Sequence, residues 1–346
     1  MDRNNILGYA VKKVDQRIKL NDFPHITENG KWTTTEDGYW TGGFWVGMLL
    51  LVYKITGDER YKAEAYNWAK RLENRKNDKT FDLSFLFYPS FVLGYDITGD
   101  RYFRKVALEA AETLSTLFHE KASFVYNKID EKIGRTIIDA MPDLQLLWWA
   151  YEETGGERFY EVARTHSMRT VDEFIRDDYS TVHVIDFDLE TGELQRKITV
   201  QGYSDDSCWS RGQAWAIYGF TLAYKHTRDE LFLRTAEKLA EYFIKNLPED
   251  YVPYWDFNDP KKELRDSSAA AIASSGLLDL SALSGKKGFR DVAINILSSL
   301  CDNYLCEEEK DGILKHGCFH KPEEKGADES LIWGDYYFIE AIMKMI

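Results

Sequence analysis

One pattern recurs five times along the 346-residue chain. Positions are counted from the first residue of a short turn. An aromatic residue stands three positions before it, a second aromatic stands five positions after it, and small or apolar residues stand nine, thirteen and sixteen positions after it. The turns are Thr56-Gly57-Asp58, Thr98-Gly99-Asp100, Thr154-Gly155, Thr227 to Asp229 and Ser284-Gly285, the last without the leading aromatic. A repeat constrains a fold more strongly than any single motif, because each copy must adopt the same structure.

Each copy reads as two helices joined by the turn. In Thr-Gly-Asp, Gly supplies the left-handed residue that ends one helix, and Asp is a preferred N-cap for the next. The later offsets place apolar residues on one face of a helix. Helices entering the turn, such as residues 144–151, are apolar nearly all round and are predicted to be inner; helices leaving it carry a charged face and are predicted to be outer.

The ends of the chain supply a sixth pair. Residues 5–19 form an amphipathic helix without a preceding partner, and residues 331–345 form an apolar helix without a following one. Pairing them closes the ring. The prediction is therefore an all-α fold, an (α/α)6 barrel of six inner and six outer helices, in which residues 1–346 are a single domain. The alternative is an open solenoid whose terminal helices act as caps. Only residues 183–200 read as a strand hairpin.

Charge and aromatic content narrow the function. Lys and Arg number 44 against 58 Asp and Glu, a net charge of −14. This argues against a nucleic-acid partner, which requires clustered cations. A mean hydropathy of −0.45 argues against a membrane partner. The 10 Trp, 21 Tyr and 19 Phe suggest a cleft for a flat or sugar-like ligand, although aromatic residues more often fill cores.

No cofactor or metal is expected. The four cysteines lack CxxC spacing, and among the histidines only His316 and His320 stand at helical spacing, without a third ligand. No Gly-rich phosphate loop is present. The N-terminus shows no charged region followed by an apolar stretch, so no secretory signal is seen and a cytoplasmic location is predicted.

The long connections lead into the inner helices, and they collect carboxylates, Trp, Arg and Gln. Because such connections lie on one face of the ring, their residues should converge on one mouth. The segments are 38–45, 81–85, 138–142, 201–215, 265–268 and 328–335. Acid groups beside aromatic rings suit carbohydrate chemistry.

Asp82 and Asp139 are the sharpest candidates, because each stands alone before a strongly apolar helix. Asp is also among the best N-cap residues, so either one by itself is more simply a cap. Two such residues across a mouth can instead divide into an ionised and a protonated member. That division would allow one to hold substrate while the other transfers a proton.

The segment from Gln201 to Trp215 is the densest in polar residues. Arg211 matches a substrate carboxylate, since its guanidinium is a two-pronged donor. It could equally form a buried salt bridge with Asp205 or Asp206. Those two acids could be catalytic, but this salt bridge or a cap for the helix that starts near Ser207 is the simpler reading.

Four further side chains are candidates for the mouth. Trp40, Trp209 and Trp215 could stack on a pyranose ring, but each alone is more often a core residue. His183 precedes the strand hairpin and is either brought to the mouth by its long loop or is an ordinary hydrogen-bonded residue.

These residues resemble the unsaturated glucuronyl hydrolases, glycoside hydrolase family 88, over nearly the whole chain. The matching motifs are Trp40-Thr-Gly-Gly-Phe-Trp-Val-Gly47, Asp82-Leu-Ser-Phe-Leu-Phe87, Ile138-Asp-Ala-Met141, Gly202-Tyr-Ser-Asp-Asp-Ser-Cys-Trp-Ser-Arg-Gly-Gln-Ala-Trp215, Arg265-Asp-Ser-Ser-Ala-Ala-Ala271 and Asp328-Glu-Ser-Leu-Ile-Trp-Gly-Asp-Tyr336. The resemblance implies an (α/α)6 barrel, in agreement with the repeat.

The resemblance also implies a reaction. The family removes the 4,5-unsaturated uronic acid that polysaccharide lyases leave at the non-reducing end of oligosaccharides, by hydrating the C4=C5 double bond. By position, Asp139 matches the general acid and base, and Asp82 the second carboxylate. The positions that match substrate-lining residues are Gln201, Arg211, Trp215, Trp40, Trp209 and His183.

The chain departs from the family's pattern near both acids. Phe81 and Ser84 stand where relatives often have His and Gly, and no Trp precedes Asp139 at the usual distance, a role that Phe124 or Tyr126 could take. Rival readings are an unsaturated rhamnogalacturonyl hydrolase, a conventional inverting glycosidase and a non-catalytic sugar-binding barrel. In each case we expect a monomer or a weak homodimer.

Overall fold

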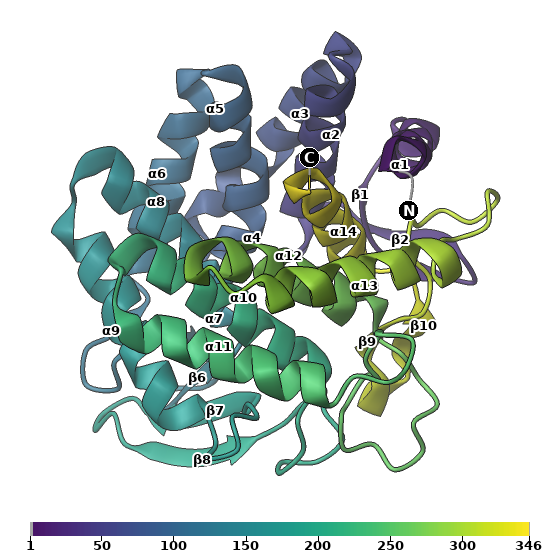
Figure 1. Ribbon diagram of the computed structural model, residues 1–346. Coiled ribbons are helices and arrows are strands. Elements are labelled where there is room, and N and C mark those ends of the chain that lie inside the picture. The colour runs from purple at the N-terminus through teal and green to yellow at the C-terminus, as the bar shows by residue number, and fades with distance from the viewer. Residues whose placement is uncertain (1–2, 346) are drawn as a thin grey trace.

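The computed structural model describes residues 3–345, so Met1, Asp2 and Ile346, which belong to the predicted domain, lie outside the described residues. Helices dominate the structure (Figure 1). The helices that enter the repeat turns are α2 (Gly42–Thr56), α4 (Leu83–Phe87) with α5 (Leu93–Thr98), α7 (Ala140–Asp143) with α8 (Gln145–Thr154), α10 (Ser210–Thr227) and α12 (Ser267–Ser284), and α14 (Ile332–Lys344) is the inner helix of the sixth pair. The others are α1 (Arg3–Arg17), α3 (Glu59–Leu72), α6 (Arg101–Ser115), α9 (Glu157–Phe174), α11 (Glu230–Lys245) and α13 (Lys287–Asn303).

The repeat turns have the predicted geometry. Gly57 adopts a left-handed φ of 69° after α2, and the Asp58 side chain accepts a hydrogen bond from Arg60 N at the start of α3. Gly99 and Asp100 repeat this arrangement between α5 and α6. These local signals end one helix and begin the next, which confirms the hairpin reading.

Burial separates the two sets of helices as predicted. Consecutive residues of α10 from Ser210 to Ala223 are all buried, and α12 is buried over a similar length. By contrast, α3 buries one face only, through Tyr61, Ala65, Trp68, Ala69 and Leu72. The first set therefore lies inside the second.

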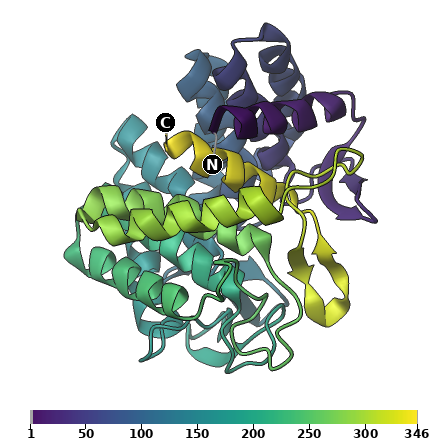
Figure 2. The ribbon, with the colours of Figure 1, turned by 45° about the vertical axis from the view of Figure 1, so that its right-hand side comes forward.

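The inner helices contact one another in sequence, and the last returns to the first. Contacts run from α2 to α4, α7, α10, α12 and α14, and α14 packs against α2. Helix α1 contacts both α2 and α14, and Figures 1 and 2 show α1 beside α14. The two terminal helices therefore pair as expected; in an open solenoid they would be far apart.

Short strands fill the long connections. The predicted hairpin is present as β7 (Val184–Asp188) and β8 (Leu194–Ile198), within an antiparallel sheet that also holds β5 (Asn127–Lys128) and β6 (Ile133–Ile137). Three other hairpins were not predicted: β1 (Phe23–Glu28) with β2 (Lys31–Thr35), β3 (Phe118–His119) with β4 (Phe124–Val125), and β9 (Gly317–His320) with β10 (Lys325–Glu329). In Figure 1, β7 and β8 lie at the lower edge of the molecule, and β9 and β10 lie to the right.

Two glycines let neighbouring inner helices approach closely. A Cβ on Gly43 of α2 would lie 2.2 Å from the carbonyl oxygen of Phe85 in α4. A Cβ on Gly219 of α10 would lie 2.5 Å from Met141 Cβ in α7. The helices that receive these contacts are the two that begin directly after Asp82 and Asp139, so the glycines set where those two acids stand.

None of the helices within residues 3–345 combines the length and the apolar character that crossing a membrane requires.

Candidate active site

A pocket of about 230 Å³ opens where the long connections meet the inner helices. Its lining combines two carboxyl groups, an Arg, an amide, a His and a majority of apolar or aromatic side chains. The lining residues are Tyr39, Trp40, Phe81, Asp82, Phe85, Ile137, Asp139, Val200, Gln201, Arg211, Phe319 and His320. The predicted convergence therefore brings together Asp82, Asp139, Trp40, Gln201 and Arg211.

Two larger hollows, of about 600 and 630 Å³, lie elsewhere on the surface. In each of them one acid pairs with a cation, Asp250 with Arg265 in the first and Glu340 with Lys344 in the second. Size alone therefore does not identify the site.

Asp139 is the N-cap residue of α7, yet its side chain makes no capping hydrogen bond. It is 8% exposed, and its Oδ2 atom is buried without a hydrogen-bond partner. Burial raises the pKa of Asp139 to about 7; Arg211 opposes this rise and Asp82 adds to it. Because desolvation outweighs the attraction of a helix N-terminus for an anion, Asp139 can hold a proton near neutral pH.

Asp82 has the same position on α4 and likewise does not cap its helix. Its Oδ2 atom accepts a hydrogen bond of 2.8 Å from Thr80 Oγ1. Burial raises the pKa of Asp82 to about 6, while the Thr80 hydroxyl and Arg75 lower it. The simpler reading of both residues as helix caps is therefore wrong: they occupy cap positions, but their carboxyl groups serve the pocket.

Trp215 lies behind this pair. The side chain is fully buried, and the Nε1 atom has no hydrogen-bond partner. Its N–H group is close enough to Asp139 to lower the pKa of that carboxyl slightly. Its ring packs on Phe85 at 5.1 Å between centroids, so Trp215 supports the pocket floor and does not line it.

Trp40 does line the pocket, where it contacts Phe85 and Trp333 at 5.6 and 4.8 Å between ring centroids. These contacts hold the indole ring as part of an aromatic wall.

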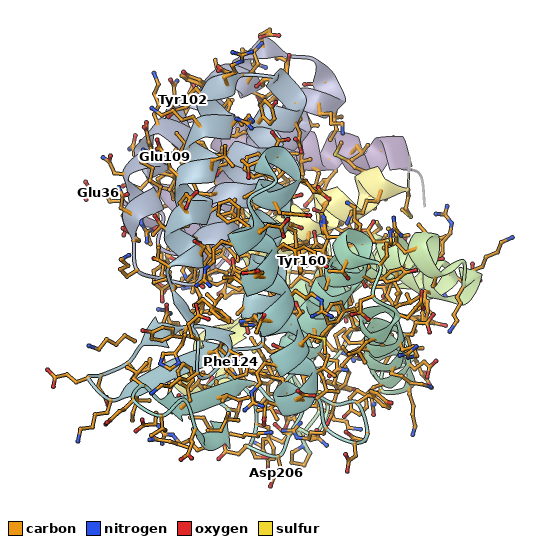
Figure 3. The ribbon with its side chains drawn as sticks, turned by 90° about the vertical axis from the view of Figure 1, so that its left-hand side faces the viewer. Glu36, Tyr102, Glu109, Phe124, Tyr160 and Asp206 are labelled. Carbon is orange, nitrogen blue, oxygen red and sulfur yellow. The ribbon has the colours of Figure 1, made fainter. Side chains whose placement is uncertain are left out.

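Arg211 does not pair with either predicted acid. Its Nη1 atom lies 2.6 Å from Asp266 Oδ2, and the two terminal nitrogens donate to the carbonyl oxygens of Cys318 and Phe319. Asp205 instead accepts a hydrogen bond from Thr199 N, and Figure 3 shows Asp206 at the lower edge of the molecule. The expected salt bridge is corrected to Asp266, the buried N-cap of α12.

Two further predicted residues, His183 and Trp209, lie close to Arg211. The imidazole ring of His183 stacks on Trp209 at 4.3 Å, and the Arg211 guanidinium lies 4.4 Å from the centre of the Trp209 ring. Both rings are buried and neither lines the pocket. Burial, with a smaller effect from Arg211, lowers the pKa of His183 to about 3, so this side chain is neutral at physiological pH.

Gln201 lines the pocket and also supports it, because its Nε2 atom donates a 2.7 Å hydrogen bond to the carbonyl oxygen of Phe319. Arg211 donates to the same oxygen, so both residues hold strand β9 over the site. The next residue, His320, is a lining residue that the sequence did not suggest. The only sequence feature that pointed to His320 as a pocket residue was its position in the last long connection between helices.

Neither proposed substitute for the missing Trp reaches the pocket. Phe124 is fully buried and packs edge-on against Phe174, beside the sheet in Figure 3. Tyr126 packs on Phe187. That expectation is wrong; the aromatic residue that precedes an acid at the pocket is Phe81, directly before Asp82.

The arrangement favours proton transfer between an uncharged acid and a sugar-sized ligand. Within residues 3–345, no three His, Cys, Asp or Glu side chains are grouped so as to hold a metal ion. Among the described residues, Asp82 and Asp139 are the two carboxyl groups that line the pocket.

Comparison with known proteins agrees with this geometry. A model of Glycosyl Hydrolase Family 88 matches residues 9–343. An unsaturated chondroitin disaccharide hydrolase of Streptococcus pneumoniae (strain ATCC BAA-255 / R6) is 36% identical over 361 residues, covering 98% of this chain and 91% of that protein. An unsaturated glucuronyl hydrolase of Formosa agariphila is 39% identical over 318 residues, covering 88% and 79%. A crystal structure of an unsaturated glucuronyl hydrolase specific for heparin superposes with a TM-score of 0.95 at 32% identity, covering 99% and 96%.

Proposed function

The chain belongs to glycosyl hydrolase family 88, and from this we propose that it releases the 4,5-unsaturated uronic acid from the non-reducing end of lyase-generated oligosaccharides. The substrate class is glycosaminoglycan or related polyuronide fragments. One observation carries the proposal: Asp82 and Asp139 face one pocket, and neither is used as a helix cap.

The proposed reaction is hydration of the C4=C5 double bond. Asp139 donates its proton to C4, and water adds at C5 while returning a proton to Asp139. The resulting hemiketal at C5 opens to a ketone, which leaves a hemiacetal at C1. That hemiacetal collapses to an aldehyde, its hydroxyl proton passes to the glycosidic oxygen, and the neighbouring sugar leaves with that oxygen. No net proton is consumed, so one group can serve as acid and then as base. A pKa near 7 suits both roles.

The other predicted residues either line the pocket or support residues that line it. Trp40 provides a face for the pyranose ring, and Asp82 binds sugar hydroxyls while remaining the more easily ionised acid. Arg211 contributes positive charge to the substrate carboxylate from the pocket wall, although its terminal nitrogens already serve Asp266 and two carbonyls. Gln201 is an amide at the same wall. His183, Trp209 and Trp215 act through the residues that they support.

The proposal extends to the whole molecule. The inner ring and its outer layer are proposed to form an (α/α)6 barrel, with residues 1–346 as one catalytic domain. The contacts that return from α14 to α2 support this. We further propose a cytoplasmic enzyme, active as a monomer or weak homodimer, that needs no metal or cofactor.

The test is the loss of ultraviolet absorbance of the conjugated C4=C5 bond in lyase-generated disaccharides from chondroitin, heparin, hyaluronan and pectin. The wild-type protein should bleach at least one uronide, and Asp139→Asn should not. Asp100→Ala, which removes a surface helix cap on α6 far from the pocket, should retain activity. Full activity in Asp139→Asn would reject the assigned acid, and turnover of pectin fragments alone would favour a rhamnogalacturonyl hydrolase.

A further inference from the structure

A third carboxyl group lies directly beneath the pocket. Asp143 is on α7, one helical turn after Asp139, and it is 1% exposed. Its Oδ1 atom accepts a 2.8 Å hydrogen bond from the backbone N–H of Phe85 in α4. Asp143 therefore joins the two helices that begin at Asp139 and at Asp82.

This contact supplies a hydrogen-bond acceptor that the N-terminus of α4 lacks. The first helical hydrogen bond of α4 runs from Leu86 N to the carbonyl oxygen of Asp82, which leaves the preceding N–H groups without partners inside the helix. A residue at the N-cap position ordinarily accepts from one of them. Asp82 does not, because its carboxylate accepts from the Thr80 hydroxyl instead.

Asp143 does for α4 what N-cap residues do for other helices of this chain. Asp58 accepts from Arg60 N of its own helix, and Asp266 accepts from Ser268 N and Ala269 N of its own. For α4 the acceptor comes from a neighbouring helix. The Ser84 N–H also lies close enough to Asp143 to lower the pKa of its carboxyl.

We propose that Asp143 is a positioning residue of the hydrolase: by capping α4 from α7, it leaves the Asp82 carboxylate free for the substrate and fixes the starts of both acid-bearing helices relative to each other. This inference rests on the proposed function.

The groups around Asp143 indicate which substitution preserves this role. Asp82 faces it from α4, Asp139 from its own helix and the Tyr337 phenol from α14. Burial, followed by the two acids, raises the pKa of Asp143 well above the ordinary value, and the backbone N–H groups oppose that rise. Asn has the same shape as Asp, and its amide oxygen keeps the acceptor that the Phe85 N–H group needs.

The experiment compares Asp143→Asn with Asp143→Ala and Asp143→Ser, both of which are too short to reach Phe85 N. kcat and KM are measured on an unsaturated disaccharide that the wild type cleaves, together with Tm. We expect kcat of the short variants to fall roughly tenfold or more, because the acids lose their relative positions. Asp143→Asn should keep kcat within about threefold of wild type.

Asp100→Ala is the matched control, since it removes a helix cap far from the pocket. It should lower Tm without changing kcat. If Asp143→Ala and Asp143→Ser lower Tm while keeping wild-type kcat, Asp143 is only a structural cap and the proposal is overturned. Loss of kcat in Asp143→Asn equal to that in Asp143→Ala would overturn it as well.

A second measurement does not depend on turnover. In a crystal structure of Asp143→Ser, the Asp82 carboxylate should turn from Thr80 to the free N–H groups of Ser84 and Phe85. An unmoved Asp82 would contradict the proposal even in an active enzyme. Conversely, a wild-type protein that cleaves no unsaturated uronide would refute the proposed function, and the position of Asp82 would still decide whether Asp143 frees it.

Discussion

The guanidinium of Arg211 lies 2.6 Å from the carboxylate of Asp266, and both side chains are almost completely buried, at 2% and 0% exposure. The pair joins α10 to the start of α12, and the same guanidinium holds the backbone of strand β9 through Phe319. One ion pair therefore connects two inner helices to a wall of the pocket.

Removing Arg211 should destabilise the protein strongly. Arg211→Met leaves the Asp266 carboxylate buried without its cation, which we expect to cost about 3–5 kcal/mol of unfolding free energy. Arg211→Lys should recover only part of this, because an ammonium group cannot reproduce the planar arrangement of donors. Urea unfolding measures both; a loss below about 1 kcal/mol for Arg211→Met would contradict a buried, unscreened pair.

The pH dependence of kcat/KM should be bell-shaped. The pKa values of the Asp82 and Asp139 carboxyls are raised by burial to about 6 and about 7. The active state of the pair carries one proton. Activity should therefore fall at low pH, where both carboxyls are protonated, and at high pH, where both are ionised. The optimum is expected between those values. A profile that stays flat from about pH 5 to pH 9 would rule out proton transfer by this pair.

Asp139→Asn should be inactive and yet more stable at neutral pH. The pKa of Asp139 is raised in the folded state, so the folded protein binds more protons than the unfolded chain between the ordinary Asp pKa and about 7. Wild-type stability is therefore lost as pH rises through that window, and the amide does not titrate. We expect a gain on the order of 2 kcal/mol for the variant at pH 8, absent near pH 4, in urea unfolding at both values.

His183 should remain neutral throughout the active range. Burial lowers its pKa to about 3, and its Nδ1 atom lies 3.0 Å from Thr199 Oγ1. In NMR spectra of the imidazole, its resonances should not shift as the pH falls from about 8 to about 5, whereas an unperturbed histidine titrates there. A midpoint near the ordinary His pKa would show that the ring is open to solvent.

Gly43→Ala should impair both stability and turnover. The added Cβ would lie 2.2 Å from Phe85 O and 2.4 Å from Leu86 O, backbone atoms that cannot turn aside. Displacement of α4 should cost about 1–3 kcal/mol and lower kcat, because Asp82 stands at the start of that helix. Gly8→Ala is the control: nothing lies within 4 Å of its Cβ, and it should stabilise α1 by about 0.5–1 kcal/mol. Equal effects at the two positions would contradict the close approach of α2 and α4.

Local signals explain why the helices were predictable. A left-handed Gly57 followed by the Asp58 cap specifies a helix end and a helix start within three residues, whatever the rest of the fold does. The β9–β10 hairpin has no such signal. Its position depends on Phe319, whose carbonyl oxygen is held by Arg211 and Gln201 from more than one hundred residues away.

In the candidate site too, features specified by neighbouring residues were predictable, and features that depend on distant contacts were not. Asp82 and Asp139 stood out because each interrupts an apolar pattern, and they do meet in one pocket. The partner of Arg211 was mistaken because nearby Asp205 and Asp206 were weighed, whereas Asp266 lies 55 positions away. Asp143 was overlooked because nothing in its own segment shows that it serves a different helix, although its spacing of one turn from Asp139 placed it on the same face.

The pairing of α1 with α14 has a consequence for synthesis of the protein. Helix α1 is synthesised long before α14, and each contributes to the packing of the other. While the polypeptide is still emerging from the ribosome, the apolar sides of α2 and α1 that face α14 have nothing to cover them. The ring can therefore close only after α14 has been synthesised, and until then the exposed apolar surface favours aggregation.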